Sequence, residues 1–374
     1  MRVYFDSAST TRVNPEVLKT YESILEKYYV NSESLYDEGT EVYRMMEKAR
    51  RAIAGLLGVT SEDIIFTSGS SESNTSAIKS VCFAQPEKKH IVTTCVEHSS
   101  ILNCCAQMER LFDYEVTYLP VDHNGRVRIE DVKNAVREDT VLVSIMWANN
   151  ESGAINPLEE IASYVKKHTH AYMHSDLTQA VGKTEIDLES VDLASISAHK
   201  LEGLKGSGIL TKRRYVPFEP LINGGEQEYG LRGGTANSPA DMVFAKTLRL
   251  AIENGRKYHS HIVTLHDELI RGLKSIEGVE INSPEDALVS TINFSYEKIP
   301  SEVMQNALNR AGFMVSARST CASKSDDPSY VLLAMGYSKR RASCCIRVSL
   351  SYYNTMEEVH AFIEALKEII KNYG

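Results

Sequence analysis

The sequence has no apolar segment long enough to cross a bilayer. Its longest apolar stretch, VLVSIMWA at residues 141–148, is far shorter than the roughly 20 residues that a membrane-spanning helix needs. The first ten residues, MRVYFDSAST, lack the apolar core of a secretory signal. We therefore expect a soluble protein of the cytoplasm with no membrane partner.

Blocks of positive charge are also missing. Lys and Arg number 41 against 50 Asp and Glu, which gives a net charge of −9. Proteins that bind nucleic acids present a basic face or stripe. The sequence therefore argues against a nucleic-acid partner.

The seven cysteines include no C-x-x-C pair, and their number is odd and their spacing irregular. This pattern argues against a zinc ribbon, another metal site or a disulfide framework. We expect most of them to be small buried residues, including Cys344 and Cys345 in their apolar stretch. Cys321 is different, because it lies in the polar segment SARSTCASKSDDP, where a thiol is accessible to a ligand.

What the sequence does contain is an alternation of apolar runs and amphipathic stretches, beginning near residue 60. The predicted strands lie within residues 63–68, 89–95, 114–121, 140–148, 171–176, 192–198 and 207–213. The predicted helices between them lie within residues 70–84, 99–111, 129–136 and 158–168. Continuous apolar strands that alternate with helices are typical of an α/β protein whose mostly parallel sheet is covered on both faces.

The pattern changes after about residue 250, where short strands between helices indicate a smaller α+β domain. The chain has 374 residues, of which 43% are apolar, and this supports two cores. We predict a large domain over residues 15–250. Residues 1–14 and 251–374 are predicted to form the small domain, which carries the loop of Cys321.

Polar residues follow several of the predicted strands, where an open parallel sheet binds its ligands. These residues are Ser70, Ser71, His98, Asn150, Asp176, Gln179, Ser197, His199 and Lys200. Each also has an ordinary structural interpretation: for example, Asp176 as a helix cap or Lys200 as a surface charge. Together they match a pyridoxal phosphate site, which needs a Schiff-base lysine, a carboxylate for the ring nitrogen and an anion-binding turn.

Several segments carry a resemblance to a known family along essentially the whole chain. They are FTSGSSES, VEHSS, ANNESG, HSDLTQAVGK, SAHKLEGLKGSG, GGEQEYGLRGGTANSP, STCASKSDDPSYVLLAMG and IRVSLSYYNT. As a set they resemble the cysteine desulfurases of the NifS/IscS type, which are class V members of the fold-type I pyridoxal phosphate enzymes.

The resemblance implies a role for each site residue. Lys200 would form the Schiff base, and Cys321 would be the nucleophile that takes sulfur from L-cysteine. His98 would stack on the ring and move protons. The remaining cofactor contacts would be Asp176 with the ring nitrogen, Gln179 with the ring oxygen, and Ser70, Ser71, Ser197, His199 and Thr235 with the phosphate.

The resemblance extends to the substrate and to partner proteins. Asn150 would contact cofactor and substrate, and Arg347 would bind the substrate carboxylate, since a guanidinium matches a carboxylate with two parallel hydrogen bonds. Thr235 would reach the phosphate from the second subunit of a homodimer. The long segment after Cys321 resembles the type that passes sulfur to an iron–sulfur scaffold or a sulfur carrier.

The sequence departs from the family pattern at Tyr36, Leu204, Tyr229 and Arg318, which changes the substrate rim and the cysteine segment. Two alternative functions therefore stay open. One is another class V enzyme: a selenocysteine lyase, a cysteine sulfinate desulfinase or a transaminase. The other is a scaffold paralogue that binds partners without the activity.

Overall fold

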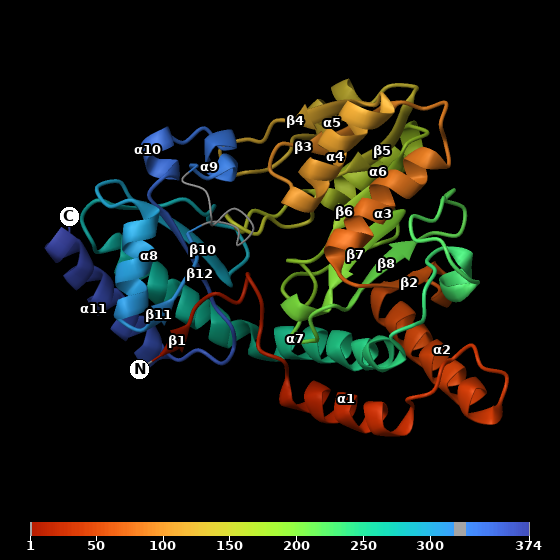
Figure 1. Cartoon of the computed structure of the whole chain (residues 1–374). Coiled ribbons are helices and arrows are strands. Elements are labelled where there is room, and N and C mark those ends of the chain that lie inside the picture. The colour runs from red at the N-terminus through yellow and green to blue at the C-terminus, as the bar shows by residue number, and fades with distance from the viewer. Residues whose placement is uncertain (1, 318–326, 374) are drawn as a thin grey trace.

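The computed structural model describes residues 2–317 and 327–373. Figure 1 shows a large α/β part and a smaller α/β part, with the long helix α7 (Ser238–Lys274) running alongside both. Both chain termini lie on the smaller part.

A seven-stranded sheet forms the centre of the large part. Its strand order is β2 (Ile64–Thr67), β8 (Gly208–Lys212), β7 (Leu193–Ser197), β6 (Tyr172–Asp176), β5 (Thr140–Ser144), β3 (His90–Thr94) and β4 (Glu115–Leu119). The five strands from β7 to β4 are parallel, and β8 runs antiparallel to both of its neighbours. The prediction of a mostly parallel sheet is confirmed, and every predicted strand contains one of these strands.

Helices cover both faces of this sheet. One face packs against α3 (Ser70–Phe83) and α4 (Ser99–Phe112). The other face packs against α2 (Asp37–Leu57), α5 (Ile129–Ala135), α6 (Leu158–His168) and the first half of α7. Because side chains alternate along a strand, Ile64 and Phe66 of β2 enter one core while Ile65 enters the other.

The helix ends follow local signals. Helix α1 (Pro15–Lys27) begins with Asn14, whose side chain accepts the backbone N–H of Glu16, followed by Pro15 in the first turn. Helix α2 ends at Gly58, which has a left-handed φ of 68°.

The smaller part has its own core around an antiparallel sheet of β12 (Cys345–Ser349), β10 (Thr291–Tyr296) and β9 (Val279–Ile281). Its helices are α8 (Ser301–Arg310), α9 (Tyr330–Ala334), α10 (Lys339–Ala342) and α11 (Met356–Tyr373). The N-terminal strand β1 (Val3–Tyr4) pairs in parallel with β11 (Phe313–Met314), which brings the first residues of the chain into this part.

Helix α7 contributes to both cores. Phe244 and Leu248 pack in the large core, whereas Leu265, Leu269 and Leu273 pack in the small one. Residue 250, the predicted domain boundary, thus lies inside a continuous helix, and the division into two domains stays a prediction. Within the described ranges, no helix is long and apolar enough to cross a membrane.

Candidate active site

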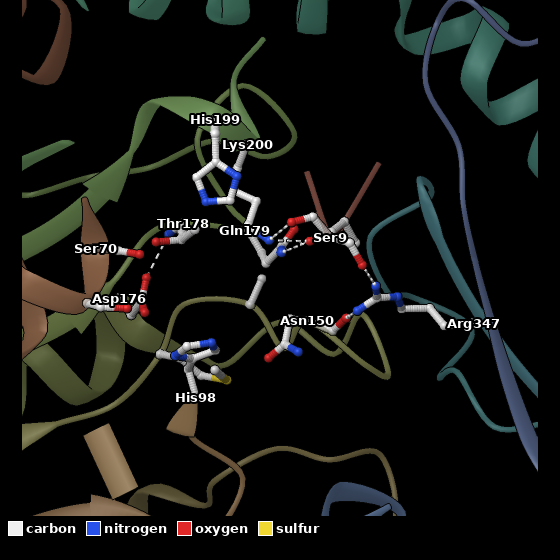
Figure 2. A pocket seen from close by; sticks show the side chains of 14 residues that line it. Ser9, Ser70, His98, Asn150, Asp176, Thr178, Gln179, His199, Lys200 and Arg347 are labelled. Carbon is white, nitrogen blue, oxygen red and sulfur yellow. Dashed lines mark hydrogen bonds between the residues drawn. The ribbon is translucent and has the colours of Figure 1, made fainter. Parts of the chain in front are cut away.

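A cavity of about 180 Å³ lies at the carboxyl ends of the parallel strands, between the two parts of the chain (Figure 2). Most of the predicted site residues line it: Ser70, Ser71, His98, Asn150, Asp176, Gln179, His199, Lys200 and Arg347. Ala8, Ser9, Met146, Ala148 and Thr178 complete the lining. The topology thus brings predicted residues from six separate segments of the chain to one place.

Lys200 ends a short 3₁₀ turn, Ala198–Lys200, directly after strand β7. Its Nζ donates hydrogen bonds to the backbone oxygens of Ala8 and Ser9, each at 2.6 Å. Figure 2 shows Lys200, Ser9 and Gln179 meeting on one side of the cavity. The N-terminal segment therefore belongs to the site, and it contacts Lys200 through two backbone oxygens.

Asp176 is the last residue of strand β6 and is almost fully buried. Its carboxylate accepts a hydrogen bond from Nδ2 of Asn74 at 2.8 Å and another from the backbone N–H of Thr178 at 2.9 Å. Asn74, inside helix α3, was not among the predicted residues. An asparagine followed by small polar residues in a helix carries no signal of its own that would have identified it.

His98 is the N-cap residue of helix α4 and also lines the cavity. Its Nδ1 accepts the backbone N–H of Ser100 at 3.2 Å and lies 2.9 Å from Oγ of the same serine. Oγ of Ser100 in turn accepts a hydrogen bond from Nδ2 of Asn74. Asn74 therefore links the carboxylate of Asp176 with the imidazole of His98.

The start of helix α3 has the features of an anion site. Its N-cap residue is Gly69, which has a φ of 144° and provides no side chain to cap the first N–H groups of the helix. Ser70 and Ser71 follow in the first turn. Strand β8 approaches so closely that a Cβ on Gly208 would lie 2.5 Å from Cα of Gly69. Backbone N–H groups at a helix start favour a negatively charged ligand, and the small residues leave it room.

Two further predicted residues lie near this turn. Ser197 is buried at the end of strand β7, and its Oγ is 3.4 Å from the place that a Cβ on Gly69 would take. His199 lines the cavity, and its pKa is lowered to about 4 by burial and by the charges of Lys200 and Lys205. A neutral imidazole at this position can donate one hydrogen bond to an anion.

Thr235 is exposed and does not line the cavity of this chain. The segment before it is held by Arg232, whose Nε lies 2.9 Å from the carboxylate of Glu72 in the first turn of α3. Its predicted contact with the phosphate of a second subunit stays a prediction.

Arg347 lies in the middle of strand β12 with a relative exposure of only 1%. It donates to the backbone oxygen of Asn150 at 2.7 Å, to the carboxylate of Asp6 at 2.9 Å and to Oγ of Ser9 at 2.6 Å. Nε of Arg347 and Oδ1 of Asn150 are buried without a hydrogen-bond partner among the described residues. Because buried polar atoms are rarely left unpaired, these two favour a polar ligand here.

Cys321 and Arg318 lie outside the described residues. Burial raises the pKa of five other thiols, those of Cys82, Cys95, Cys104, Cys105 and Cys344. A raised pKa leaves little thiolate at neutral pH, so these cysteines are poor nucleophiles. Over residues 2–317 and 327–373, no group of His, Cys, Asp and Glu side chains forms a metal site.

The set of side chains defines the ligands that the cavity suits. A lysine amine, a buried carboxylate and an imidazole lie together beside an anion-binding turn, and a guanidinium lies on the other side (Figure 2). The first group fits a phosphorylated aldehyde with a basic ring nitrogen. The guanidinium fits a substrate that carries a carboxylate.

Comparisons with known proteins agree with this description. A sequence model of the family "Aminotransferase class-V" matches residues 3–362. The cysteine desulfurase IscS of Methanosarcina thermophila is 38% identical over 373 residues, which cover 99% of this chain and 92% of that protein. A solved structure named NifS-like protein has a TM-score of 0.93 at 39% identity and covers 100% of both chains. A second, SspA in complex with cysteine, has a TM-score of 0.82 at 30% identity and covers 95% of this chain and 100% of that one.

Proposed function

Because the chain belongs to the class V aminotransferase family, we propose that it is a pyridoxal phosphate-dependent cysteine desulfurase. The family confirms the predicted fold class and the predicted cofactor. The desulfurase activity is supported by full-length similarity to proteins named for it. The substrate is L-cysteine, the molecule bound in one of the similar structures.

One observation carries the proposal: a single cavity contains Lys200, the buried carboxylate of Asp176 and the buried guanidinium of Arg347. Lys200 would hold pyridoxal phosphate through its amine, and Asp176 would keep the ring nitrogen protonated. The turn at Ser70 and Ser71 would hold the phosphate. When bound, the cofactor withdraws electrons from the amino acid and weakens the bonds at its α-carbon.

The residues of the chain orient the substrate and move its protons. Arg347 turns toward the substrate carboxylate, which would satisfy its unpaired Nε. His98 keeps Nδ1 toward Ser100 and so carries its proton on Nε2 when neutral, available for transfer. The thiolate of Cys321 would attack the substrate sulfur, so that the S–S bond forms as the bond between the sulfur and the β-carbon breaks. The electron pair of the broken bond would stay with the carbon skeleton, which takes up a proton and leaves as L-alanine, and Cys321 would hold the sulfur as a persulfide.

The partners follow from the same proposal. We infer a cytoplasmic homodimer in which Thr235 of each subunit completes the phosphate site of the other. The persulfide on Cys321 is passed to an iron–sulfur scaffold or a sulfur carrier. Two-fold homodimers are the commonest soluble oligomers, and sedimentation of the holoenzyme tests this one.

The test of the function is product formation from L-cysteine in the presence of a thiol reductant. We expect equal amounts of L-alanine and sulfide, and loss of both in Cys321→Ala with the cofactor absorbance retained. Alanine from L-selenocysteine or L-cysteine sulfinate alone, with full activity of Cys321→Ala, would instead identify one of the other class V activities. A protein that binds no cofactor would identify a scaffold paralogue.

A further inference from the structure

Lys183 has no role in the chemistry described so far. It follows strand β6, four residues after Gln179, and its Nζ donates a hydrogen bond to Oε1 of Gln179 at 2.7 Å. Gln179 lines the active-site cavity, whereas Lys183 lines a neighbouring cavity that Lys200 also borders. Lys183 thus acts on the site through a residue that lines it.

The contact fixes the orientation of the Gln179 amide. A glutamine amide has an acceptor end and a donor end, and an ammonium group can only donate. In its charged form Lys183 therefore holds Oε1 toward itself and leaves the donor end facing the other way. That end, Nε2, donates to the backbone oxygen of Ala8 at 2.9 Å, the same oxygen that accepts Nζ of Lys200.

The charge of Lys183 acts in the same region. Its pKa is lowered to about 7, first by burial and then by the charges of Lys200 and Arg347. Since Coulomb repulsion is mutual, a charge on Lys183 also disfavours a proton on the nitrogen of Lys200. Other titratable groups border the two cavities that Lys183 lines: Glu159, Glu185, Asp187, Glu202, Arg256, His259 and Tyr352. The two charged groups that shift its pKa are Lys200 and Arg347.

We propose that Lys183 is a positioning residue that keeps Nε2 of Gln179 facing away from itself, so that the N–H not donated to Ala8 would be available to the ring oxygen of the bound cofactor. A donor at that oxygen stabilises its anionic form, and this lowers the proton affinity of the adjacent nitrogen of Lys200. The orientation of the Gln179 amide and the charge of Lys183 therefore both lower the proton affinity of the Lys200 nitrogen. This inference rests on the proposed function, because it requires pyridoxal phosphate at Lys200.

The experiment is a pH titration of the absorption band of the bound cofactor. Lys183→Met removes both the donor and the charge, and we expect the midpoint to rise by roughly 0.5–1 pH unit. Lys183→Gln is a second variant in case the first does not fold. It is also expected to raise the midpoint, because it is uncharged and its own amide accepts either orientation of Gln179.

Lys212 supplies a matched control. It is a buried lysine at the other end of the sheet, and its Nζ donates to the backbone oxygens of Arg213 and Val216 at 3.0 and 2.9 Å. Burial lowers its pKa as well. Lys212→Met therefore removes a buried amine without affecting Gln179, and its midpoint should equal that of the wild type.

The possible outcomes separate this inference from the proposed function. Unchanged midpoints in both Lys183 variants, or an equal shift in Lys212→Met, would overturn the role of Lys183 while alanine production from L-cysteine stands. A wild type that shows a pH-dependent cofactor band but makes no alanine would overturn the desulfurase function, and the titration would still test Lys183. A wild type without the band would overturn both.

Discussion

Asn74 holds two parts of the active site together, so its removal should affect cofactor binding as well as stability. The side chain is fully buried, and its Nδ2 donates to the carboxylate of Asp176 at 2.8 Å and to Oγ of Ser100 at 2.9 Å. A hydrogen bond to a charged group contributes roughly 1.5–3 kcal/mol and a neutral one roughly 0.5–1.5 kcal/mol. Oδ1 of Asn74 is already buried without a hydrogen-bond partner, so its removal offsets about 1 kcal/mol of the loss in the free energy of unfolding.

We therefore expect Asn74→Ala to lower the free energy of unfolding of the cofactor-free protein by about 2–3 kcal/mol. The carboxylate of Asp176 would still accept the hydrogen bond from the backbone N–H of Thr178 but would lose the one from Nδ2 of Asn74. If about 1.4 kcal/mol of this lost hydrogen-bond energy also stabilises the bound cofactor, the affinity of the protein for the cofactor falls roughly tenfold. Urea unfolding followed by circular dichroism measures the first effect, and absorbance titration with pyridoxal phosphate measures the second.

Asn282 offers the control, because it is also buried and also donates twice, to Oδ1 of Asn293 at 2.8 Å and to Oγ of Ser295 at 2.7 Å. It belongs to the small part of the chain, away from the cavity. Oδ1 of Asn282 also accepts a hydrogen bond from Nε of Arg341 at 2.6 Å, so Asn282→Ala should destabilise the protein at least as much as Asn74→Ala and should leave the cofactor affinity unchanged. Wild-type cofactor affinity in Asn74→Ala, or an equal loss in Asn282→Ala, would refute the reasoning.

Three further substitutions test ionisable groups, two that line the cavity (Arg347 and His199) and one that precedes His98 in the chain (Glu97). Arg347→Lys loses the planar fork, so we expect the KM for L-cysteine to rise at least roughly tenfold with the cofactor spectrum retained, and an unchanged KM would contradict the carboxylate role. Burial raises the pKa of Glu97 from 4.5 to about 8. Between these two pH values the folded protein keeps a proton that the unfolded chain releases, so the free energy of unfolding falls as the pH rises toward 8. Glu97→Gln should therefore gain stability relative to the wild type between pH 5 and 8, whereas a constant difference in unfolding free energy would disprove it. The pKa of His199 is lowered from 6.5 to about 4. The unfolded chain therefore takes up a proton that the folded protein does not, and the free energy of unfolding falls as the pH falls from about 6.5 toward 4. His199→Asn should show a weaker loss of stability over that range, and the same pH dependence as the wild type would contradict the buried neutral imidazole.

The strands of the large part could be predicted because both faces of their sheet are buried. Val141, Leu142 and Val143 of strand β5, for example, are all inaccessible to solvent, and such runs stand out from the amphipathic helices between them. The reversed direction of β8 could not be predicted, since its apolar residues look like those of a parallel strand.

Helix α7 contains a glycine whose reason lies in the tertiary structure. Gly255 packs so closely against the backbone of Gly182 that a Cβ there would lie 1.9 Å from the oxygen of Gly182. The change of pattern near residue 250 predicts a domain boundary there, whereas one helix continues through that position and through Gly255. Only the tertiary contact explains the residue.

Within the site, the residues at strand ends could be predicted, and those that act from elsewhere could not. Lys200 and Asp176 lie at the carboxyl ends of apolar strands, which is where an open parallel sheet binds its ligands. Ala8 contributes a backbone oxygen and Lys183 contacts Gln179 rather than the ligand, so the position of a residue after a strand identifies neither of them. Cys321 stays a prediction from its polar surroundings and from the resemblance.

The most direct test of the account is to identify the lysine that carries the cofactor. Borohydride reduction of the purified protein fixes pyridoxal phosphate on its lysine, and digestion with mass spectrometry then locates the modified residue. We predict Lys200, which lies just after strand β7 and in the cavity with Asp176 and Arg347. Modification of another lysine, such as the nearby Lys183, would contradict the assignment on which the proposed mechanism depends.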